Sequence, residues 1–573
     1  MDGAEDPGKL SSTLHDPTNT QPLLVKPYPT TIASTSGTEQ EEEEEEEDQS
    51  QYLQISYNFG PRSLKDLPIL LLFSLLVLST FGFGIFASVH KNPHRSQISS
   101  FIYNTTSLSC TLLKNFETPT SLNPQKSNLF YDFTDIPSFS ENPTSSRSSV
   151  LKSLIWTLVL TLILSAPFVL SVLLLLKHYT KQIVYASLPF FIIVPIFINV
   201  YWFVACTLNS TCSHSFPLAY RIIVLVFVFL IIGVIVWIFV VNWHRIELTV
   251  NIVGVASNAL SKNLGLFGVL PALTVSLFVY YVPIVVFLIF ANRNGKIVPK
   301  EENGEYYCVW KQDSWVPAYY TLAILTMLWS ATAMVEAQVY VISGTIAQWY
   351  FSKDDSGPQR GIRSSLRNAF GPSSGTICFS GLLIFAVRLI RSVVDNARQE
   401  EASGIVNLIL RCCVNSLFTA VDFLNKFTIN FAAITGEGYC SASRMTYELL
   451  KRNLLSAVIV ETVSTRILAG IVLVLSVIYA IVVCVILKAL IHLGNDAYFV
   501  ALMAWIVLIV ILGFFVHILD NVIDTVYVCY AIDRDRGEVN KQDVHQVYVH
   551  LPISRSHSHR AGFVIIPRSP PLV

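Results

Sequence analysis

Long apolar runs dominate the chain between positions 67 and 527. A helix needs about 20 such residues to cross a bilayer, because each residue advances it by about 1.5 Å. Several runs reach this length: 67–89, 151–176, 183–207, 221–242, 268–291, 317–350, 374–393, 458–489 and 498–527. The pattern predicts an all-α polytopic membrane protein.

A tenth span is predicted over 405–440, which is less apolar than the other runs. Asp422, Lys426 and Glu437 are its charged exceptions, and charged residues in 388–401 and 422–452 blur its boundaries. Ten spans place both termini on one side of the membrane, which we expect to be the cytosol.

The segment 246–265 is too polar to span, yet it carries apolar residues at helical spacing: Ile246, Val250, Ile252, Val253, Val255 and Ala256. The spacing is consistent with an interfacial helix on the inner face or with a simple linker.

The two ends of the chain have a different composition. Residues 1–60 are rich in Ser, Thr, Pro and acidic residues, including an unbroken acidic run from Glu41 to Asp48. Such a segment buries too little apolar surface to offset the entropy of ordering, so we expect a disordered cytosolic tail. The predicted organisation is this tail, a transmembrane domain over 61–536 with a first extracytosolic loop at 90–150, and a cytosolic tail over 537–573.

Composition narrows the function classes. Hydrophobic residues make up 52% of the chain and charged residues 14%, against about 25% charged in a soluble domain. The formal net charge of −1 argues against a nucleic-acid partner. We find no metal-ligand spacing, no cofactor motif and no catalytic constellation. GPSSG at 371–375 fits the G-x-S-x-G pattern of hydrolases, but it precedes a membrane helix rather than following a strand.

Basic residues and sequons set the expected orientation. Lys177, Lys181 and Arg245 lie in loops on the side of the N-terminus, as does the basic segment 353–367. The opposing loop 292–316 also has four basic residues, so this rule alone is not decisive. The sequons at Asn104 and Asn209 fall in the first and third loops, which share the outer side. We predict glycosylation at Asn104 and poor modification at Asn209, which is close to the bilayer.

The outer cysteines form an odd set of Cys110, Cys212 and Cys308, with Cys206 near the boundary. One disulfide among them is expected, and its connectivity cannot be read from the sequence.

Four segments in order resemble the choline transporter-like family of solute carriers. They are WSAT at 329–332 with SGTIAQWYF at 343–351, GPSSGTICFSG at 371–381, LNKFTINFAAITGEGYC at 424–440 with LLKRN at 449–453, and DNVIDTVYVCYAID at 520–533. The resemblance covers about 317–536, and the first five spans agree in layout. Asn430, Phe431 and Tyr439 depart from the family pattern. The resemblance implies ten spans, a plasma-membrane or organellar location, and sodium-independent movement of choline or ethanolamine.

A quaternary ammonium cannot donate hydrogen bonds, so a site for it combines aromatic faces with a negative charge. Trp329, Glu336, Tyr340 and Ser343 recur at helical spacing on one face of the sixth span, together with Thr332. An adjacent stripe of small residues suits close helix packing. We predict that Trp329, Glu336, Tyr340 and Ser343 bind the substrate. The alternative is that Glu336 pairs with a basic residue such as Arg388, or stays protonated, and only joins helices.

Other polar and aromatic features in the predicted spans have structural or functional interpretations. Trp349 and Tyr350 fit an interfacial anchor. Asp520 and Asp524 fit structural pairing or an inner vestibule. Gly436 and Gly438 around Glu437 fit an unwound turn facing a cavity or a tight helix contact.

We therefore expect a transporter of a choline-like cation embedded in the lipid bilayer. The alternative is a non-transporting membrane protein that affects lipid homeostasis or trafficking through partners, which the acidic tail favours. The sequence does not indicate an oligomeric state.

Overall fold

The computed structural model describes residues 57–93, 95, 98, 101–105, 107–112, 144–208, 212, 215–302, 305–352, 361–399, 405–490 and 494–551. Within this part of the chain, nine helices are long and apolar enough to cross a membrane. They are α2 (Leu67–Val89), α3 (Thr144–Leu208), α5 (Leu218–Val241), α7 (Leu266–Ala291), α8 (Val316–Phe351), α10 (Ser374–Gln399), α11 (Ile405–Thr435), α12 (Tyr439–Leu490) and α13 (Asp496–Arg536). The all-α polytopic class is confirmed.

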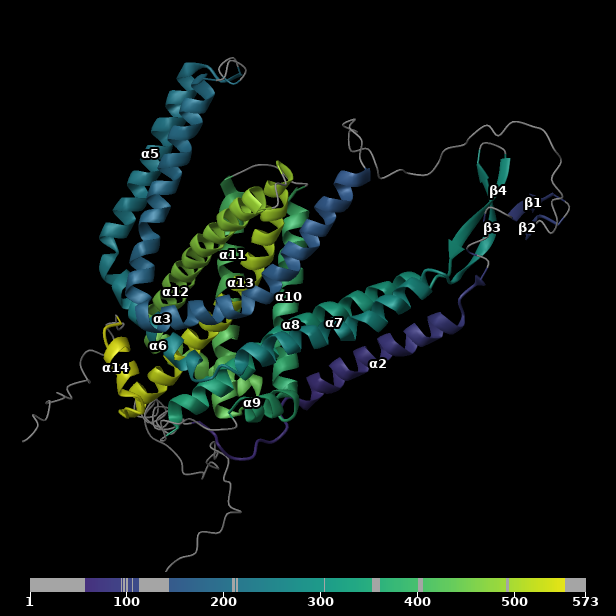
Figure 1. The fold of residues 1–573 in the computed structure, drawn as a ribbon. Helices are drawn as coiled ribbons and strands as arrows, with labels where there is room; N and C mark the ends of the chain where they lie inside the picture. The colour runs from purple at the N-terminus through teal and green to yellow at the C-terminus, as the bar shows by residue number, and fades with distance from the viewer. Residues whose placement is uncertain are drawn as a thin grey trace, which may run out of the picture.

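α3 contains two of the predicted spans. Its apolar part has 58 residues, about 87 Å of helix, which is enough for two crossings of a core of about 30 Å. The backbone is non-helical at Tyr179, between the two apolar runs. The helix bends there, and its second arm lies beside α5 (Figure 1). Each of the ten predicted runs therefore contains a membrane-length stretch of helix, although the helix of the run 405–440 ends at Thr435.

Turn residues fix where several helices begin and end. Asp66 has a φ of 52°, and a proline follows in the first turn of α2, where a missing N–H costs nothing. Gly436 has a φ of 78° and stops α11. Residues 436–438 are not helical, and α12 starts at Tyr439. The turn is therefore unwound, as one interpretation of Gly436 and Gly438 expected, but it packs closely on Arg62 and Asp66.

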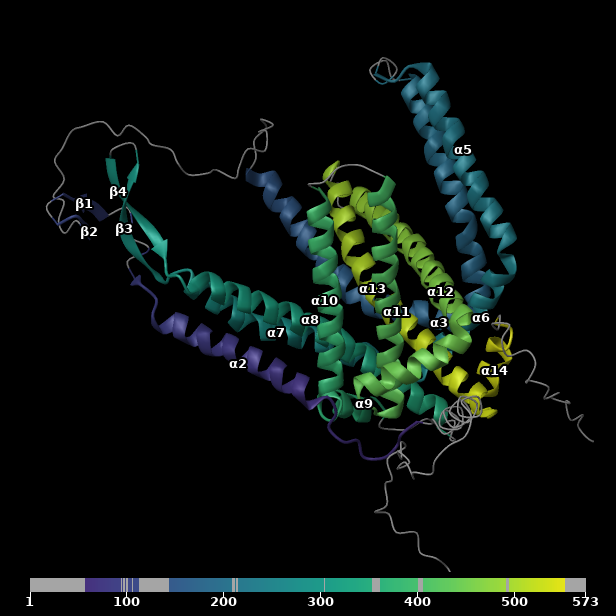
Figure 2. The same cartoon turned by 180° about the vertical axis from the view of Figure 1, so that it is seen from behind.

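The helices form three groups that both views separate (Figures 1 and 2). α10, α11, α12 and α13 stand together as a bundle. α2, α7 and the first half of α8 project from it as an arm that carries the strands at its far end. The second arm of α3 and α5 project as a hairpin. α9 (Gly361–Phe370), α14 (Gln542–Tyr548) and the start of α2 lie at the opposite end from the strands, which we call the α9 end.

The strand end ties two loops together. β1 (Phe101–Asn104) pairs with β2 (Ser109–Leu112), and β3 (Gly295–Glu302) pairs with β4 (Glu305–Gln312), both antiparallel. A disulfide joins Cys110 of β2 to Cys308 of β4. The Tyr103 and Tyr306 rings stack across the hairpins with centroids 4.7 Å apart. The first loop and the loop after α7 therefore lie on the same side of the membrane.

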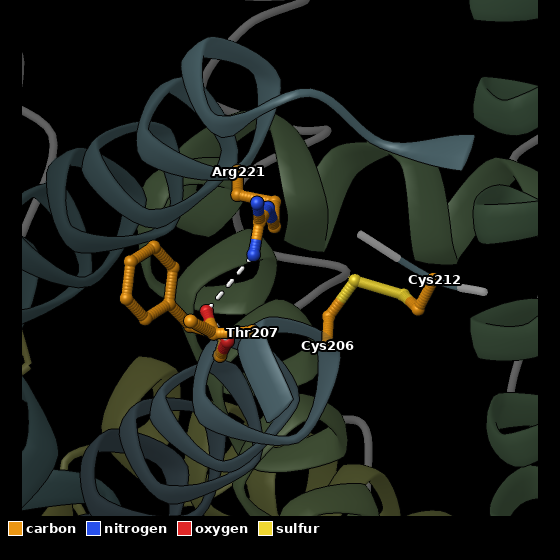
Figure 3. The surroundings of a disulfide bond; sticks show 5 residues. Cys206, Thr207, Cys212 and Arg221 are labelled. Carbon is orange, nitrogen blue, oxygen red and sulfur yellow. Dashed lines mark hydrogen bonds between the residues drawn. A yellow bond between two sulfur atoms is a disulfide. The ribbon is translucent and has the colours of Figure 1, made fainter. Parts of the chain in front are cut away.

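A second disulfide closes the end of the α3–α5 hairpin (Figure 3). Cys206 in the last turn of α3 bonds to Cys212, with Cα atoms 5.1 Å apart. Beside it, the guanidinium Nη1 of Arg221 donates to Thr207 Oγ1 at 2.9 Å. A disulfide among the outer cysteines was expected, and the structure has two, Cys110–Cys308 and Cys206–Cys212. Cys206 reaches Cys212 because the chain turns directly after α3, which residue counting could not show.

α6 (Trp243–Ser261) corrects the prediction for 246–265. The segment is helical, but its apolar residues Ile252, Val253 and Ala256 are buried against protein rather than against lipid. α6 packs on α3, α12, α13 and α14. An amphipathic face predicts only that something apolar covers it, and here the bundle itself does so.

Each of the two predicted tails includes residues that pack against the helices. Tyr57 is buried, and Asn58 N–H donates to the Ile434 carbonyl at 3.1 Å, so residues 57–60 belong with the helices. In the C-terminal segment, Val544 and Tyr548 of α14 are buried as well. Residues 1–56 and 552–573 lie outside the described residues.

Candidate substrate site

The Glu336 carboxylate on α8 is the centre of a buried polar cluster. Ser380 Oγ on α10 lies 2.8 Å from Glu336 Oε2, and Asn425 Nδ2 on α11 donates to the same oxygen at 3.3 Å. The Tyr439 hydroxyl of α12 donates to Asn425 Oδ1 at 2.6 Å. Ser380 Oγ is also 3.0 Å from Asn425 Oδ1. Its single proton can serve only one of these two acceptors at a time.

Among the described residues, no basic side chain forms an ion pair with Glu336. Arg388, which the structural alternative gave as an example of a partner, is exposed and forms no ion pair with Glu336, although its positive charge acts electrostatically on the carboxyl group. Arg391 of the same helix lies 4.0 Å from Asp422. Glu336 itself is only 9% exposed. A carboxylate within a bilayer is costly unless it faces a cavity, a proton or a cation. The cluster therefore holds a negative charge, or the proton that neutralises it, through hydrogen bonds from neutral side chains.

Small residues bring the helices close enough for these contacts. A Cβ on Gly381 of α10 would lie 2.7 Å from the Cα and N atoms of Ala333 on α8. A Cβ on Gly344 would lie 2.8 Å from Ser365 Oγ on α9. The predicted stripe of small residues beside the polar face thus packs directly against α9 and α10.

Trp329 contacts α2 and α10. Its Nε1–H donates to the carbonyl of Cys378 at 3.0 Å, and its ring meets Phe73 edge-on with centroids 5.1 Å apart. The indole N–H satisfies a backbone acceptor between helices, and the ring is 5% exposed.

Tyr340 and Ser343 are fully buried and contact different elements. The Tyr340 hydroxyl lies 2.7 Å from Ser373 Oγ and accepts from Arg62 Nη1 at 2.5 Å. Ser343 Oγ donates to Asn430 Oδ1 at 2.7 Å and accepts from Thr525 Oγ1 at 3.1 Å. The four predicted residues share one face of α8, but each contacts a different set of neighbours.

Residues 57–66 lie at the α9 end beside Tyr340. We call this segment the N-terminal strap. Asp66 Oδ2 accepts from the Tyr439 N–H and from Thr376 Oγ1, both at 2.7 Å. These groups belong to the first turns of α12 and α10, where free N–H groups favour a carboxylate. Burial raises the pKa of Tyr57 to about 12 despite the nearby Arg62 charge, so this phenol stays neutral at physiological pH.

A separate ion cluster joins α11, α12 and α13. Lys426 Nζ lies 2.8 Å from Asp520 Oδ2, 2.5 Å from Asp524 Oδ2 and 3.5 Å from Glu461 Oε1. Thr465 Oγ1 donates to Asp520 Oδ1 at 2.7 Å. Asp520 and Asp524 therefore pair with a lysine from another helix, which agrees with their structural interpretation.

The interfacial-anchor interpretation of Trp349 and Tyr350 was wrong. Both residues are buried, and the Tyr350 hydroxyl donates to Asp533 Oδ2 at 2.9 Å. Lys262 and Lys541 lie 5.9 and 5.8 Å from the centroid of the Trp349 ring. Protein therefore covers both side chains at this end of α8.

Sequence reasoning missed Ser380, Asn425, Tyr439 and Arg62 as site residues. Three of these lie within segments that carry the family resemblance, 371–381 and 424–440. The available signal was that these segments carry the family resemblance together with the segment that contains Glu336. Arg62 gave no comparable signal, because it precedes the first apolar run.

The matched region of the chain includes the whole Glu336 cluster. Residues 226–535 match the family model described as plasma-membrane choline transporter. This is more than half of the chain. The chain belongs to the choline transporter-like family. The N-terminal strap lies outside the residues matched to the family.

Individual members of the choline transporter-like family match over shorter stretches. A CTL-like protein of Dictyostelium discoideum is 25% identical over 227 residues, which are 38% of this chain and 40% of that protein. Choline transporter-like protein 2 of Xenopus laevis is 25% identical over 227 residues, 37% of this chain and 32% of its own length. Choline transporter-like protein 5 of Macaca fascicularis is 22% identical over 158 residues, 26% of this chain and 22% of that protein. The chain thus spans about two fifths or less of the relatives it matches.

The predicted glycosylation sites lie in the loops of this choline transporter-like chain. Asn104 is the last residue of β1, opposite Ser109 of β2. Asn209 lies outside the described residues, and in the sequence it falls between the disulfide-bonded Cys206 and Cys212.

Proposed function

We propose that this protein carries choline or a related small organic cation such as ethanolamine across a membrane, by alternating access and without sodium. The observation that supports this most is the buried Glu336 carboxylate, whose hydrogen-bond partners are the neutral Ser380 and Asn425. Such a site can offer its negative charge to a bound cation, because no basic side chain among the described residues forms an ion pair with it. Membership of a family named for choline transport supports the substrate class.

In this proposal Glu336 provides the counter-charge or a coupling proton site. Trp329 and Tyr340, with Ser343 further along the same face of α8, complete the substrate-binding face. The Tyr439 ring stacks on Phe379 with centroids 4.6 Å apart and adds a further aromatic surface beside Asn425. Aromatic faces attract an alkylated ammonium by about 0.5–2 kcal/mol each, and more where water is excluded.

We further propose that the strand end is extracytosolic, that the α9 end is cytosolic, and that the protein acts at the plasma membrane or an endomembrane. Both disulfides support this orientation, because they lie in the loops that the sequons assign to the outer side and because disulfides persist in oxidising compartments.

Flux of radiolabelled choline into proteoliposomes that contain only the purified protein tests the function. We expect uptake above that of empty liposomes, competition by ethanolamine, and no change when sodium is replaced by potassium. Uptake equal to that of empty liposomes, with the protein correctly inserted, would favour the alternative of a non-transporting membrane protein that acts on lipid homeostasis or trafficking.

A further inference from the structure

The guanidinium of Arg62 occupies a cage made of neutral acceptors. Its Nη1 donates to the Tyr340 hydroxyl at 2.5 Å, and its Nη2 donates to the Ala433 carbonyl at 2.9 Å. The carbonyls of Ile434 and Asn58 lie 3.4 Å from the same Nη2. The guanidinium carbon lies 5.6 Å from the centroid of the Tyr57 ring.

The cage is negative because of where α11 ends. Ala433 and Ile434 belong to its last turn, whose carbonyls have no partner within the helix and carry the negative end of its dipole. Broken membrane helices use such ends to hold cations. Among the described residues, no carboxylate pairs with Arg62, so the carbonyls and tyrosines alone stabilise its charge.

The fit of Arg62 in this cage is incomplete. Its Nε is buried with no hydrogen-bond acceptor among the described residues. A buried donor without an acceptor costs about 1–3 kcal/mol. The cage thus favours a cation with several N–H donors, but it is not matched to all the donors of a guanidinium.

Glycines allow the strap to bring Arg62 here. A Cβ on Gly375 would lie 2.3 Å from the Lys65 carbonyl oxygen, and one on Gly436 would lie 3.0 Å from Arg62 Cδ. The same strap is linked to the Glu336 cluster through Tyr439, whose N–H bonds to Asp66 and whose hydroxyl bonds to Asn425. Movement of the strap would therefore alter both the cage and the cluster.

We propose that this cage is a second cation site, one helical turn from Glu336 toward the α9 end, which Arg62 occupies as an internal competitor. When the strap leaves, an organic ammonium with N–H donors, such as ethanolammonium, binds the carbonyls of Ala433 and Ile434 and the Tyr340 hydroxyl. This inference rests on the proposed function for the identity of the ligand. Its test does not depend on transport.

Cysteine reactivity at position 373 reports on the cage, because Ser373 is 2% exposed and its hydroxyl contacts Tyr340. Ser373→Cys is placed in the full chain with every cysteine outside the two disulfides replaced by alanine. The rate of modification by a small water-soluble maleimide is then measured on purified protein. We expect Arg62→Ala to raise this rate about tenfold, equivalent to about 1.4 kcal/mol of opening. Leu64→Ala, at a strap residue that is 61% exposed, is the matched control and should leave the rate unchanged.

Ligand protection then identifies the site as one for cations. Ethanolammonium at millimolar concentration should slow modification of the Arg62→Ala protein, and tetramethylammonium, which has no donors, should not.

Gly375→Ala displaces the strap with Arg62 intact and should also raise the rate, which covers the case in which Arg62→Ala does not fold. A rate that neither variant raises would refute the competitor role. A raised rate that ethanolammonium does not lower would refute the cation site. Either result can be obtained whether or not choline flux is observed, so it is separable from failure of the proposed function.

Discussion

The carboxylate of Glu336 carries the strongest single-residue prediction. Glu336→Gln keeps the size of the side chain and its hydrogen bonds to Ser380 and Asn425, but removes the charge. Two opposite charges about 4 Å apart attract each other by about 4 kcal/mol at an effective dielectric constant of about 20. We therefore expect choline affinity or transport rate to fall by roughly tenfold or more. The wild-type rate should fall at acidic pH, because protons compete with the cation for the carboxylate, and the variant should lose this dependence.

Choline uptake measured from pH 5.5 to 8.5 in proteoliposomes checks this prediction, with expression and monodispersity as controls for folding. Unchanged affinity, rate and pH profile in a folded Glu336→Gln protein would assign the carboxylate a structural role.

Trp329 offers a prediction that separates stacking on the substrate from helix packing. Its N–H donates to the Cys378 carbonyl, so Trp329→Phe removes one hydrogen bond, while Trp329→Ala removes the ring as well. If the ring contacts the cation, Trp329→Ala should weaken choline transport more than ethanolamine transport, since the primary amine can still donate hydrogen bonds. Competition assays with both amines measure this ratio. An equal loss for both, with lower thermal stability, would show that the ring only holds α8 to α10 and α2.

At the scale of elements, the contact of α8 with α10 positions the Glu336 cluster. Gly381→Ala would place a Cβ 2.7 Å from backbone atoms of Ala333, which cannot move aside independently. Overpacking of this kind costs about 1–3 kcal/mol. Gly82→Ala in α2 is a matched control, because no atom lies within 4 Å of its added Cβ. Thermal unfolding in detergent should show a lower midpoint for Gly381→Ala alone. Equal midpoints would mean that the two helices separate without cost.

The strand end gives a prediction for orientation. Asn104 lies in β1, and the Cys110–Cys308 disulfide ties this hairpin to the loop after α7. In a eukaryotic cell, Asn104→Gln should abolish a glycosidase-sensitive mass shift, whereas Asn209→Gln should change it little. Gel mobility before and after glycosidase treatment is the measurement. A cytosolic signal from an epitope in this loop would reverse the orientation.

For the molecule as a whole, the first 50 residues should be dispensable while the strap is not. Tyr57, the first residue that the structure describes, is already buried, and the acidic run ends at Asp48. Segments with few apolar residues tolerate truncation. A protein lacking residues 1–50 should insert and carry choline at a rate within about twofold of the full chain. Proteoliposome flux compares the two proteins. Loss of flux by a correctly inserted truncation would make the tail part of the transport machinery.

The sequence by itself determined the membrane class and the positions of the spans, because a bilayer requires long apolar helices whatever their neighbours. α2 begins and ends where its apolar run does, and α8 differs from its predicted run by one residue at each end. The sequence also placed Trp329, Glu336, Tyr340 and Ser343 on one face, since helical periodicity is local.

Only the tertiary structure decided which groups meet. Ser380 and Asn425 reach Glu336 from α10 and α11, and Tyr439 of α12 bonds to Asn425. The neighbouring helices cover the apolar face of α6. Arg62 reaches Tyr340 across a separation of 278 residues. Such contacts depend on how helices cross and where they break, which the hydrophobic period of one segment does not encode. The burial of a charge likewise depends on all the groups around it. The sequence therefore does not show that the Arg62 guanidinium lies at the end of α11, because this position results from the packing of the N-terminal strap.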